Sequence, residues 1–254
     1  MDAKRASLLR AVTVAAIICA LELLCRTGII TRFTMIPPSE MVLALVSIVL
    51  HANWFWTDFG YTTRNLLAAT VASVLIGYVL GAIIHAMPRV RRVLEPVLLS
   101  YYSVPTFVFY PLLIVVFGIG SLSLIALGAI FSIVAMVMST LTSIDRIPRG
   151  LVKVAKVTRL TPLQTILYVK LPAAAPHLFT GVKLAVIYSV IGVIAGEFIV
   201  STAGIGRRIA FAYNDFDNQT MYGMLLLVIS LVAILNGALH AIERRLHQRW
   251  SRAK

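Results

Sequence analysis

The polar residues best suited to chemistry stand inside long apolar runs. Glu197 lies near the end of one such run, from about Pro176 to Val200, and Lys183 lies near its start. A charged side chain costs roughly 2.5–3.5 kcal/mol at the centre of a bilayer and less near an interface. We therefore interpret Glu197 as a candidate for lining a gate, or as a partner for Arg207 or Arg208.

A second polar group surrounds a proline in another apolar run, Pro96–Gly118. Proline removes a backbone donor and disturbs a helix, which is tolerated where protein or water satisfies the freed carbonyl groups. Candidates for lining a pathway at this kink are Tyr101, Tyr102, Ser103, Pro105 and Thr106. The alternative is that the tyrosines lie at the membrane interface with their hydroxyls among lipid headgroups.

Other chemistries find little support. The sequence contains no Walker-type glycine-rich loop, so this chain offers no site of that kind, and any ATP and Mg²⁺ would be bound by another chain. It shows no nucleophile, metal-ligand set or carboxylate pair near an interface, and His85, His177 and His240 lie at helix ends rather than together. The formal net charge is +13, but the basic residues lie between apolar runs and form no nucleic-acid patch. We expect no catalytic residue, metal or cofactor in this chain.

The composition predicts an all-α protein that crosses a bilayer several times. The chain has 254 residues, 59% hydrophobic and 13% charged, and lipid is the natural solvent for so much apolar surface. A spanning helix needs about 20 apolar residues. We predict about six such helices: Ser7–Cys25, Leu66–Met87, Pro96–Gly118, Leu122–Ile144, Pro176–Val200 and Met221–Ile242.

Three details qualify this count. The first run also resembles a signal peptide, but no small-x-small cleavage site follows it and a Glu22–Arg26 pair continues the helix, which favours a retained helix. Met41–Leu50 is too short to span and is predicted to lie in the interface, after a proline start. Cys19 and Cys25 are not expected to form a disulfide.

Small residues at helical spacing predict close helix packing. They form the patterns Ser73-x3-Gly77-x3-Gly81 and Gly192-x3-Gly196.

The distribution of Lys and Arg predicts the orientation. With both termini in the cytoplasm, 17 of the 23 basic residues lie on the inner side and five on the outer side. The longest inner loop, about Asp145–Ala175, then joins the fourth and fifth helices. It is basic, and its apolar residues have near-helical spacing. It is either a surface helix held to anionic lipid or a helix that docks a cytoplasmic partner.

This loop resembles the permeases of binding-protein-dependent ABC importers, in the branch that serves nitrate, sulfonates and taurine. Those proteins carry Glu-Ala-Ala, three residues and Gly here, followed by Leu-Pro. Lys153 stands at the Glu position, Val154 at the first Ala and Arg159 at the Gly, whereas Leu171-Pro172 matches. Further agreement comes from Glu95-Pro96, Pro105, Phe117-Gly118-Ile119-Gly120, Glu197 and Gly204-Ile205-Gly206.

The resemblance implies a transmembrane permease subunit of an ATP-driven importer, with a cytoplasmic coupling helix between its fourth and fifth helices. The residues implied in coupling to an ATPase are Lys153, Val154, Ala155, Lys156, Arg159, Thr161, Leu171 and Pro172. The expected domains are 1–60, an N-terminal helix and interfacial segment, 61–246, the permease domain, and 247–254, a basic cytoplasmic tail. If the φ angle of Arg159 is positive, its side chain adds a steric cost.

The implied partners are an ABC ATPase dimer, a second permease subunit, an extracytoplasmic solute-binding protein and the lipid of a bacterial-type inner membrane. The departures at Lys153 and Arg159 suggest the hypothesis of a heterodimer with a better-matching permease. The outer segment Ser201–Thr220 is expected to meet the binding protein. The solute is predicted to be a small anion such as a sulfonate, taurine or nitrate. The alternative is a secondary transporter driven by an ion gradient, which should show internal repeats and paired acids at mid-membrane.

Overall fold

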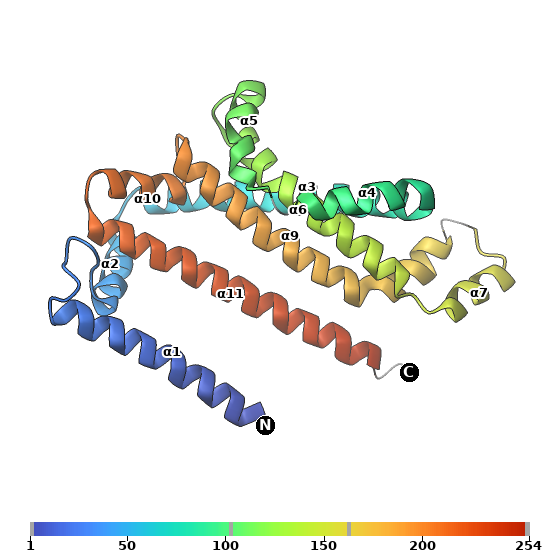
Figure 1. Ribbon diagram of the computed structural model, residues 1–254, viewed down its shortest axis with the longest axis horizontal. Helices are drawn as coiled ribbons and strands as arrows, with labels where there is room; N and C mark the ends of the chain where they lie inside the picture. The colour runs from blue at the N-terminus through green and yellow to red at the C-terminus, as the bar shows by residue number, and fades with distance from the viewer. Residues whose placement is uncertain (1–2, 102–103, 162–163, 252–254) are drawn as a thin grey trace.

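A computed structural model describes residues 3–101, 104–161 and 164–251. Its helices are α1 (Ala3–Arg26), α2 (Pro38–His51), α3 (Phe55–Ala86), α4 (Pro88–Tyr101), the 3-10 helix η1 (Thr106–Phe109), α5 (Tyr110–Phe117), α6 (Ser121–Asp145), α7 (Arg149–Val157), the π-helix η2 (Thr165–Lys170), α9 (Leu171–Ile199), α10 (Ile205–Asn214) and α11 (Asn218–Ser251). Figure 1 shows an elongated helical bundle with α1 set apart from it.

Four helices among the described residues are long and apolar enough to cross a membrane. They cover Phe55–Ala86, Ser121–Asp145, Thr165–Ile199 and Asn218–Arg245, and they confirm four of the predicted spans. Two boundaries were wrong. α3 begins at Phe55 rather than Leu66, and Pro176 lies inside α9 because the helix already begins at Leu171, with Pro172 in its first turn. A proline in the first turn costs no intrahelical hydrogen bond.

The predicted continuous helix Pro96–Gly118 is wrong. α4 includes Pro96 and ends at Tyr101, and the chain then resumes as η1 and α5. Pro105 has an extended backbone, and a residue that precedes proline is sterically biased away from the α conformation. The helix therefore breaks before Pro105, and α5 projects away from the bundle (Figure 1).

α1 is helical over the predicted first span but is not among the four long apolar helices, and α2 is helical over the segment predicted to lie in the interface. The expected Glu22–Arg26 pair forms, with 2.6 Å between the carboxylate and Nε, and Glu22 also accepts a hydrogen bond from the Ser39 hydroxyl at 2.7 Å. These contacts join the end of α1 to the start of α2. Cys19 and Cys25 are both free thiols, as predicted.

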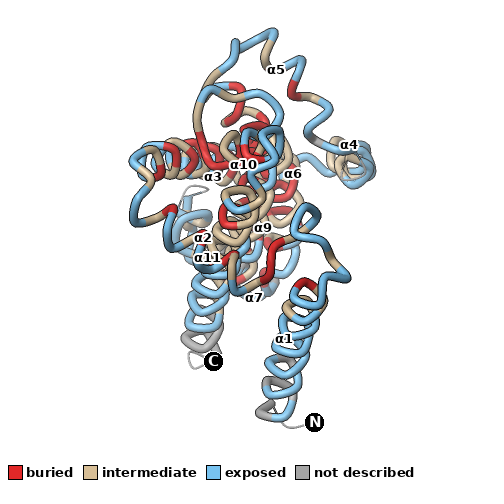
Figure 2. Tube along the Cα trace, turned by 90° about the vertical axis from the view of Figure 1, so that its left-hand side faces the viewer, coloured by how far each residue is buried: buried red, intermediate tan, exposed pale blue. Residues whose placement is uncertain are grey.

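α3, α6 and α9 form the centre of the bundle, where most buried residues gather (Figure 2). Small residues allow this approach, since a Cβ added to Gly77 would lie 2.6 Å from the Met136 Cβ, and one added to Gly192 would lie 2.6 Å from the Gly128 Cα. Both predicted small-residue patterns therefore serve helix packing. On α3, buried residues recur every three or four positions from Phe55 to Gly81, so one face of that helix is closed by its neighbours.

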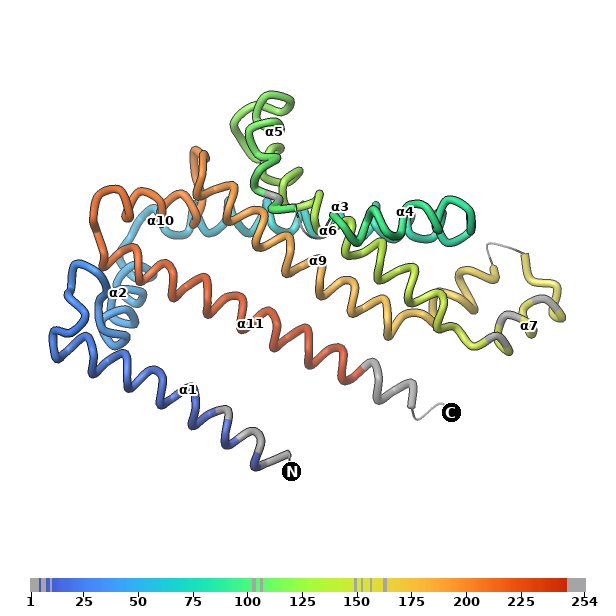
Figure 3. Tube along the Cα trace, in the orientation of Figure 1, coloured from blue at the N-terminus to red at the C-terminus, as the bar shows by residue number. Residues whose placement is uncertain are grey.

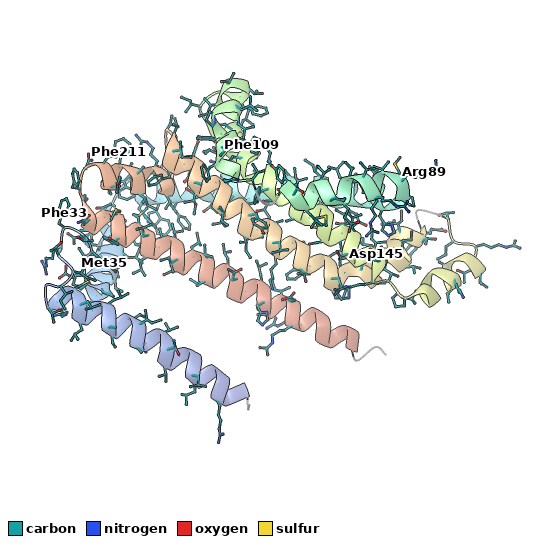
Figure 4. The ribbon with its side chains drawn as sticks, in the orientation of Figure 1. Phe33, Met35, Arg89, Phe109, Asp145 and Phe211 are labelled. Atoms are coloured by element: carbon teal, nitrogen blue, oxygen red, sulfur yellow. The ribbon has the colours of Figure 1, made fainter. Side chains whose placement is uncertain are left out.

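The two ends of the bundle are distinct. α2 and α10 lie at one end, and α7 lies at the other (Figure 3). Phe33, Met35 and Phe211 mark the first end, whereas Arg89 and Asp145 mark the second (Figure 4).

Candidate functional site

α7 is a short helix that the bundle holds by few contacts. Ile147, just before it, is buried against Met136, Ala174 and Leu178. Within α7, Ala155 is only 1% exposed, whereas Val154 is 59% and Val157 is 83% exposed. The predicted helix in this loop is confirmed, and its apolar residues remain largely uncovered by the rest of the chain.

The end of α7 takes a left-handed turn at Arg159. Its φ is +53°, and the N–H of Leu160 donates to the Ala155 carbonyl at 3.1 Å. This six-to-one bond is the mark of a Schellman cap, whose left-handed position is usually glycine. The turn therefore has the positive φ that glycine favours, and Arg159 bears the steric cost anticipated from the sequence.

The next helix starts with a reciprocal cap. The N–H of Thr161 donates to Gln164 Oε1 at 2.9 Å, and the N–H of Gln164 donates to Thr161 Oγ1 at 3.3 Å. This is a capping box, and its signal in the sequence is Thr-x-x-Gln. The chain continues through η2 into α9, with Leu171 packed beside the cluster that contains Ile147.

The predicted coupling residues therefore occupy one continuous segment. Lys153, Val154, Ala155 and Lys156 lie on α7, Arg159 and Thr161 form the turn, and Leu171 and Pro172 open α9. The side chain of Lys156 lies outside the described residues, whereas Lys153 is exposed. Residues 146–170 include six basic residues and no acidic one.

At the opposite end, Glu197 is fully buried between α3 and the start of α10. Its carboxylate accepts hydrogen bonds from the Thr62 hydroxyl at 2.8 and 2.9 Å and from the Gly206 N–H at 3.0 Å. A Cβ added to Gly204, whose φ is +112°, would lie 2.3 Å from the Glu197 carboxyl carbon. The Gly204-Ile205-Gly206 turn thus wraps closely around the carboxylate.

Asp58 holds the same turn from another side. Its Oδ1 accepts a hydrogen bond from the Gly204 N–H at 3.0 Å, and its Oδ2 pairs with Arg208 Nε at 2.5 Å. Arg208 also lies over the Trp54 ring, 4.4 Å from its centroid. The predicted pairing of Glu197 with Arg208 is therefore wrong, because Asp58, which the sequence analysis did not single out, is the carboxylate that takes this arginine.

Arg207 is not the partner of Glu197 either. Its guanidinium lies over the Phe211 ring, 4.5 Å from the ring centroid. Glu197 has its hydrogen-bond donors on α3 and in the turn, so the observed contacts give it a role in joining these elements.

The pathway candidates near Pro105 form part of an aromatic cluster. Tyr101 stacks with Phe109 at 6.3 Å between centroids and contacts Phe131 at 5.5 Å, and Phe131 meets Tyr188 at 5.3 Å. The Tyr101 hydroxyl is buried and has no hydrogen-bond partner among the described residues. Pro105 caps η1, which begins at Thr106. Tyr102 and Ser103 lie outside the described residues, as does the side chain of Thr106.

Two sets of charges that sequence reasoning missed lie toward the α7 end. Arg91 binds both carboxylate oxygens of Asp145, at 2.8 and 2.6 Å, and also contacts Glu95. The hydrogen bonds that Arg91 donates to Asp145 and, to a lesser extent, to Glu95 raise the pKa of its guanidinium above the ordinary value. Lys183, isolated in sequence, pairs with Glu243 on α11 at 2.8 Å. Neither pair has a local sequence signal.

A cavity of about 240 Å³ with both polar and apolar lining residues lies between α6 and α9. Its polar lining consists of Ser139, Thr142, Ser143, Arg146, His177 and Thr180. The hydroxyls of Thr142 and Ser143 donate to carbonyls of their own helix. Arg146 adds a positive charge to this lining.

Comparison with known proteins places the chain in a family. Residues 73–252 match the family described as "Binding-protein-dependent transport system inner membrane component". The taurine transport system permease protein TauC of Escherichia coli K12 is 25% identical over 216 residues, which cover 83% of this chain and 78% of that protein. The nitrate import permease protein NrtB of Leptolyngbya laminosa is 29% identical over 185 residues, or 73% of this chain and 66% of that protein.

A solved structure of the MetNI methionine ABC transporter, in an inward-facing conformation, has the same fold. Its TM-score is 0.62 at 20% identity, and the match covers 77% of this chain and 99% of that one. Because the family match spans well over half of the sequence, this chain belongs to the family of binding-protein-dependent transport system inner membrane components.

Proposed function

We propose that this chain forms the translocation pathway of an ATP-driven importer and that α7 couples it to the ATPase. As the inner-membrane permease component, the chain is not itself the ATPase, and a binding-protein-dependent system implies ATPase and binding-protein partners. The observation that carries the coupling role is the turn at Arg159. Its positive φ, followed at once by the Thr161–Gln164 cap, holds a mostly uncovered α7 beyond the bundle.

The orientation proposed is that both termini and α7 face the cytoplasm. The charge bias supports it, since 17 of 23 basic residues then lie inside. The arrangement in Figure 3 is compatible, because α11 runs from the α10 end of the bundle toward the end where α7 lies. The turn around Glu197 and α10 would then face outward.

The proposed solute is a small anion such as taurine, another sulfonate or nitrate. Two observations support this choice. TauC and NrtB are named for taurine and nitrate, and Arg146 lines a cavity rich in hydroxyls near the α7 end. Tyr101 and its aromatic neighbours are the proposed lining farther along, and Glu197 acts near the outer gate. Two permease chains, identical or different, would enclose the pathway.

We propose that α10 meets the solute-binding protein. Phe211, Tyr213 and Phe216 are exposed there, and Phe216 stacks on Phe33 with 5.6 Å between ring centroids. Exposed aromatic rings beside arginines are typical of protein interfaces. This face lies at the opposite end of the bundle from α7 (Figure 4).

Uptake into proteoliposomes tests the function. The permease, its ATPase and its binding protein should accumulate labelled taurine or nitrate only when ATP is present inside, and an ionophore should leave uptake unchanged. Deletion of Lys153–Leu160 should abolish uptake while the binding protein still binds its solute. Uptake that needs an ion gradient and no ATPase would instead support the secondary-transporter alternative.

A further inference from the structure

The positive charge around α7 has no compensating acid within its own segment. The six basic residues of 146–170 are accompanied by no Asp or Glu. The acid just before them, Asp145, is already bound by Arg91 and lies 3.1 Å from His85. Lys153 and Arg159 are exposed and form no ion pair with another described residue, so their charge is available to a partner.

The exposed surface of α7 combines this charge with apolar side chains. Lys153 is exposed, and Val154 and Val157 are among the most exposed apolar residues of the segment. Arg159, also exposed, follows at the left-handed turn. An apolar strip beside cationic side chains suits a groove with an apolar floor and an anionic wall.

A protein groove fits this surface better than a lipid surface does. Ala155 packs against the rest of the chain, and the exposed Val154 and Val157 would be buried by a protein groove and by lipid alike, so the position of the helix decides between them. α7 lies beyond the end of α6, whose 25 residues already exceed the roughly 20 that span a bilayer.

We propose that α7 seats in a groove of the partner ATPase that carries acidic side chains opposite Lys153 and Arg159. The inference rests on the proposed function and adds the chemistry of the partner. A charge that enters an interface without an opposite charge loses its hydration and gains nothing in exchange, so the exposed Lys153 and Arg159 favour a groove that carries acidic side chains. The opposite charges then select an ATPase with an acidic groove over one with a basic groove.

Zero-length crosslinking tests the contact directly. A water-soluble carbodiimide joins a lysine amine to a carboxylate only when the two touch. In the assembled permease–ATPase complex, we expect mass spectrometry to find Lys153 joined to an Asp or Glu of the ATPase. The matched control is Lys153→Arg, which keeps the positive charge but has no amine and should lose the crosslink. An active complex in which Lys153 reacts with no ATPase carboxylate would overturn the proposal.

Binding measurements separate the possible partners. Lys153→Gln should weaken ATPase association about fivefold to tenfold at low salt and reduce its salt dependence, whereas Arg89→Gln, the same charge loss at the same end, should change it less than twofold. Unchanged association, with weaker binding to phosphatidylglycerol vesicles, would overturn the proposal in favour of lipid. Uptake without any ATPase would instead refute the proposed function.

Discussion

The two ends of this permease use charged residues in opposite ways. Around Gly204–Arg208, the carboxylates of Glu197 and Asp58 are buried and their hydrogen-bond donors come from the same chain. Around α7, Lys153 and Arg159 are exposed and the segment lacks acids. A closed network, in which every charged group is paired within one subunit, stabilises that subunit. Exposed charges without such pairs form an open interface and need a partner subunit to neutralise them. Substitutions at the first end should therefore change stability, and substitutions at the second should change coupling.

The largest expected effect is that of Glu197→Ala. It removes the acceptor for the Thr62 hydroxyl and the Gly206 N–H and leaves both buried, which should lower stability by about 3 kcal/mol. Thermal unfolding in detergent measures the loss, and Glu197→Gln, which keeps one acceptor oxygen, should lose less. If Glu197→Ala is as stable as the wild type, the buried network at this end does not stabilise the subunit, and the proposed difference between the two ends is wrong.

Arg208→Ala comes next. It leaves the Asp58 carboxylate buried without its cation, which should cost about 2–3 kcal/mol. The neighbouring Arg207→Ala removes a cation–π contact with Phe211 and should cost less than about 1 kcal/mol. Parallel unfolding curves of the two variants provide the comparison, and equal losses would contradict the assignment of Arg208 to the closed network.

Arg159→Gly should raise stability by about 1 kcal/mol, because glycine adopts a φ of +53° without the steric cost of a side chain. The same variant should lower ATP-driven uptake, since it removes a proposed docking charge. Arg159→Ala separates the two effects, because it loses the charge but keeps the unfavourable φ. A stability gain in the Ala variant as large as in the Gly variant would show that φ is not the cause.

The smallest stability effect is expected for Lys153→Gln. An exposed side chain with no intrachain role should shift stability by less than about 0.5 kcal/mol, while ATPase stimulation by the solute falls. Unfolding and ATPase assays on one preparation test both parts. A large drop in stability would place Lys153 in the permanent structure of the subunit rather than at an open interface.

Much of the architecture follows from local sequence features. Apolar length predicted the four long helices, and small-residue spacing predicted the close contacts at Gly77 and Gly192. The helix at α7 was also foreseen, because amphipathic spacing acts over a few residues, whereas the sign of φ at Arg159 was left open by the sequence. The break before Pro105 was not predicted as an end to α4, because proline can also be accommodated within a membrane helix when its neighbours satisfy the backbone.

Hydropathy and periodicity are enough to specify which segments of this chain are helical and apolar, since each helix satisfies its own backbone hydrogen bonds. The partners of the charged residues depend on how those helices pack. Glu197 meets Thr62, Asp58 meets Arg208 and Lys183 meets Glu243 across separations of 135, 150 and 60 residues. A buried carboxylate takes whichever donor the folded backbone brings within about 3 Å, and no local pattern encodes that distance.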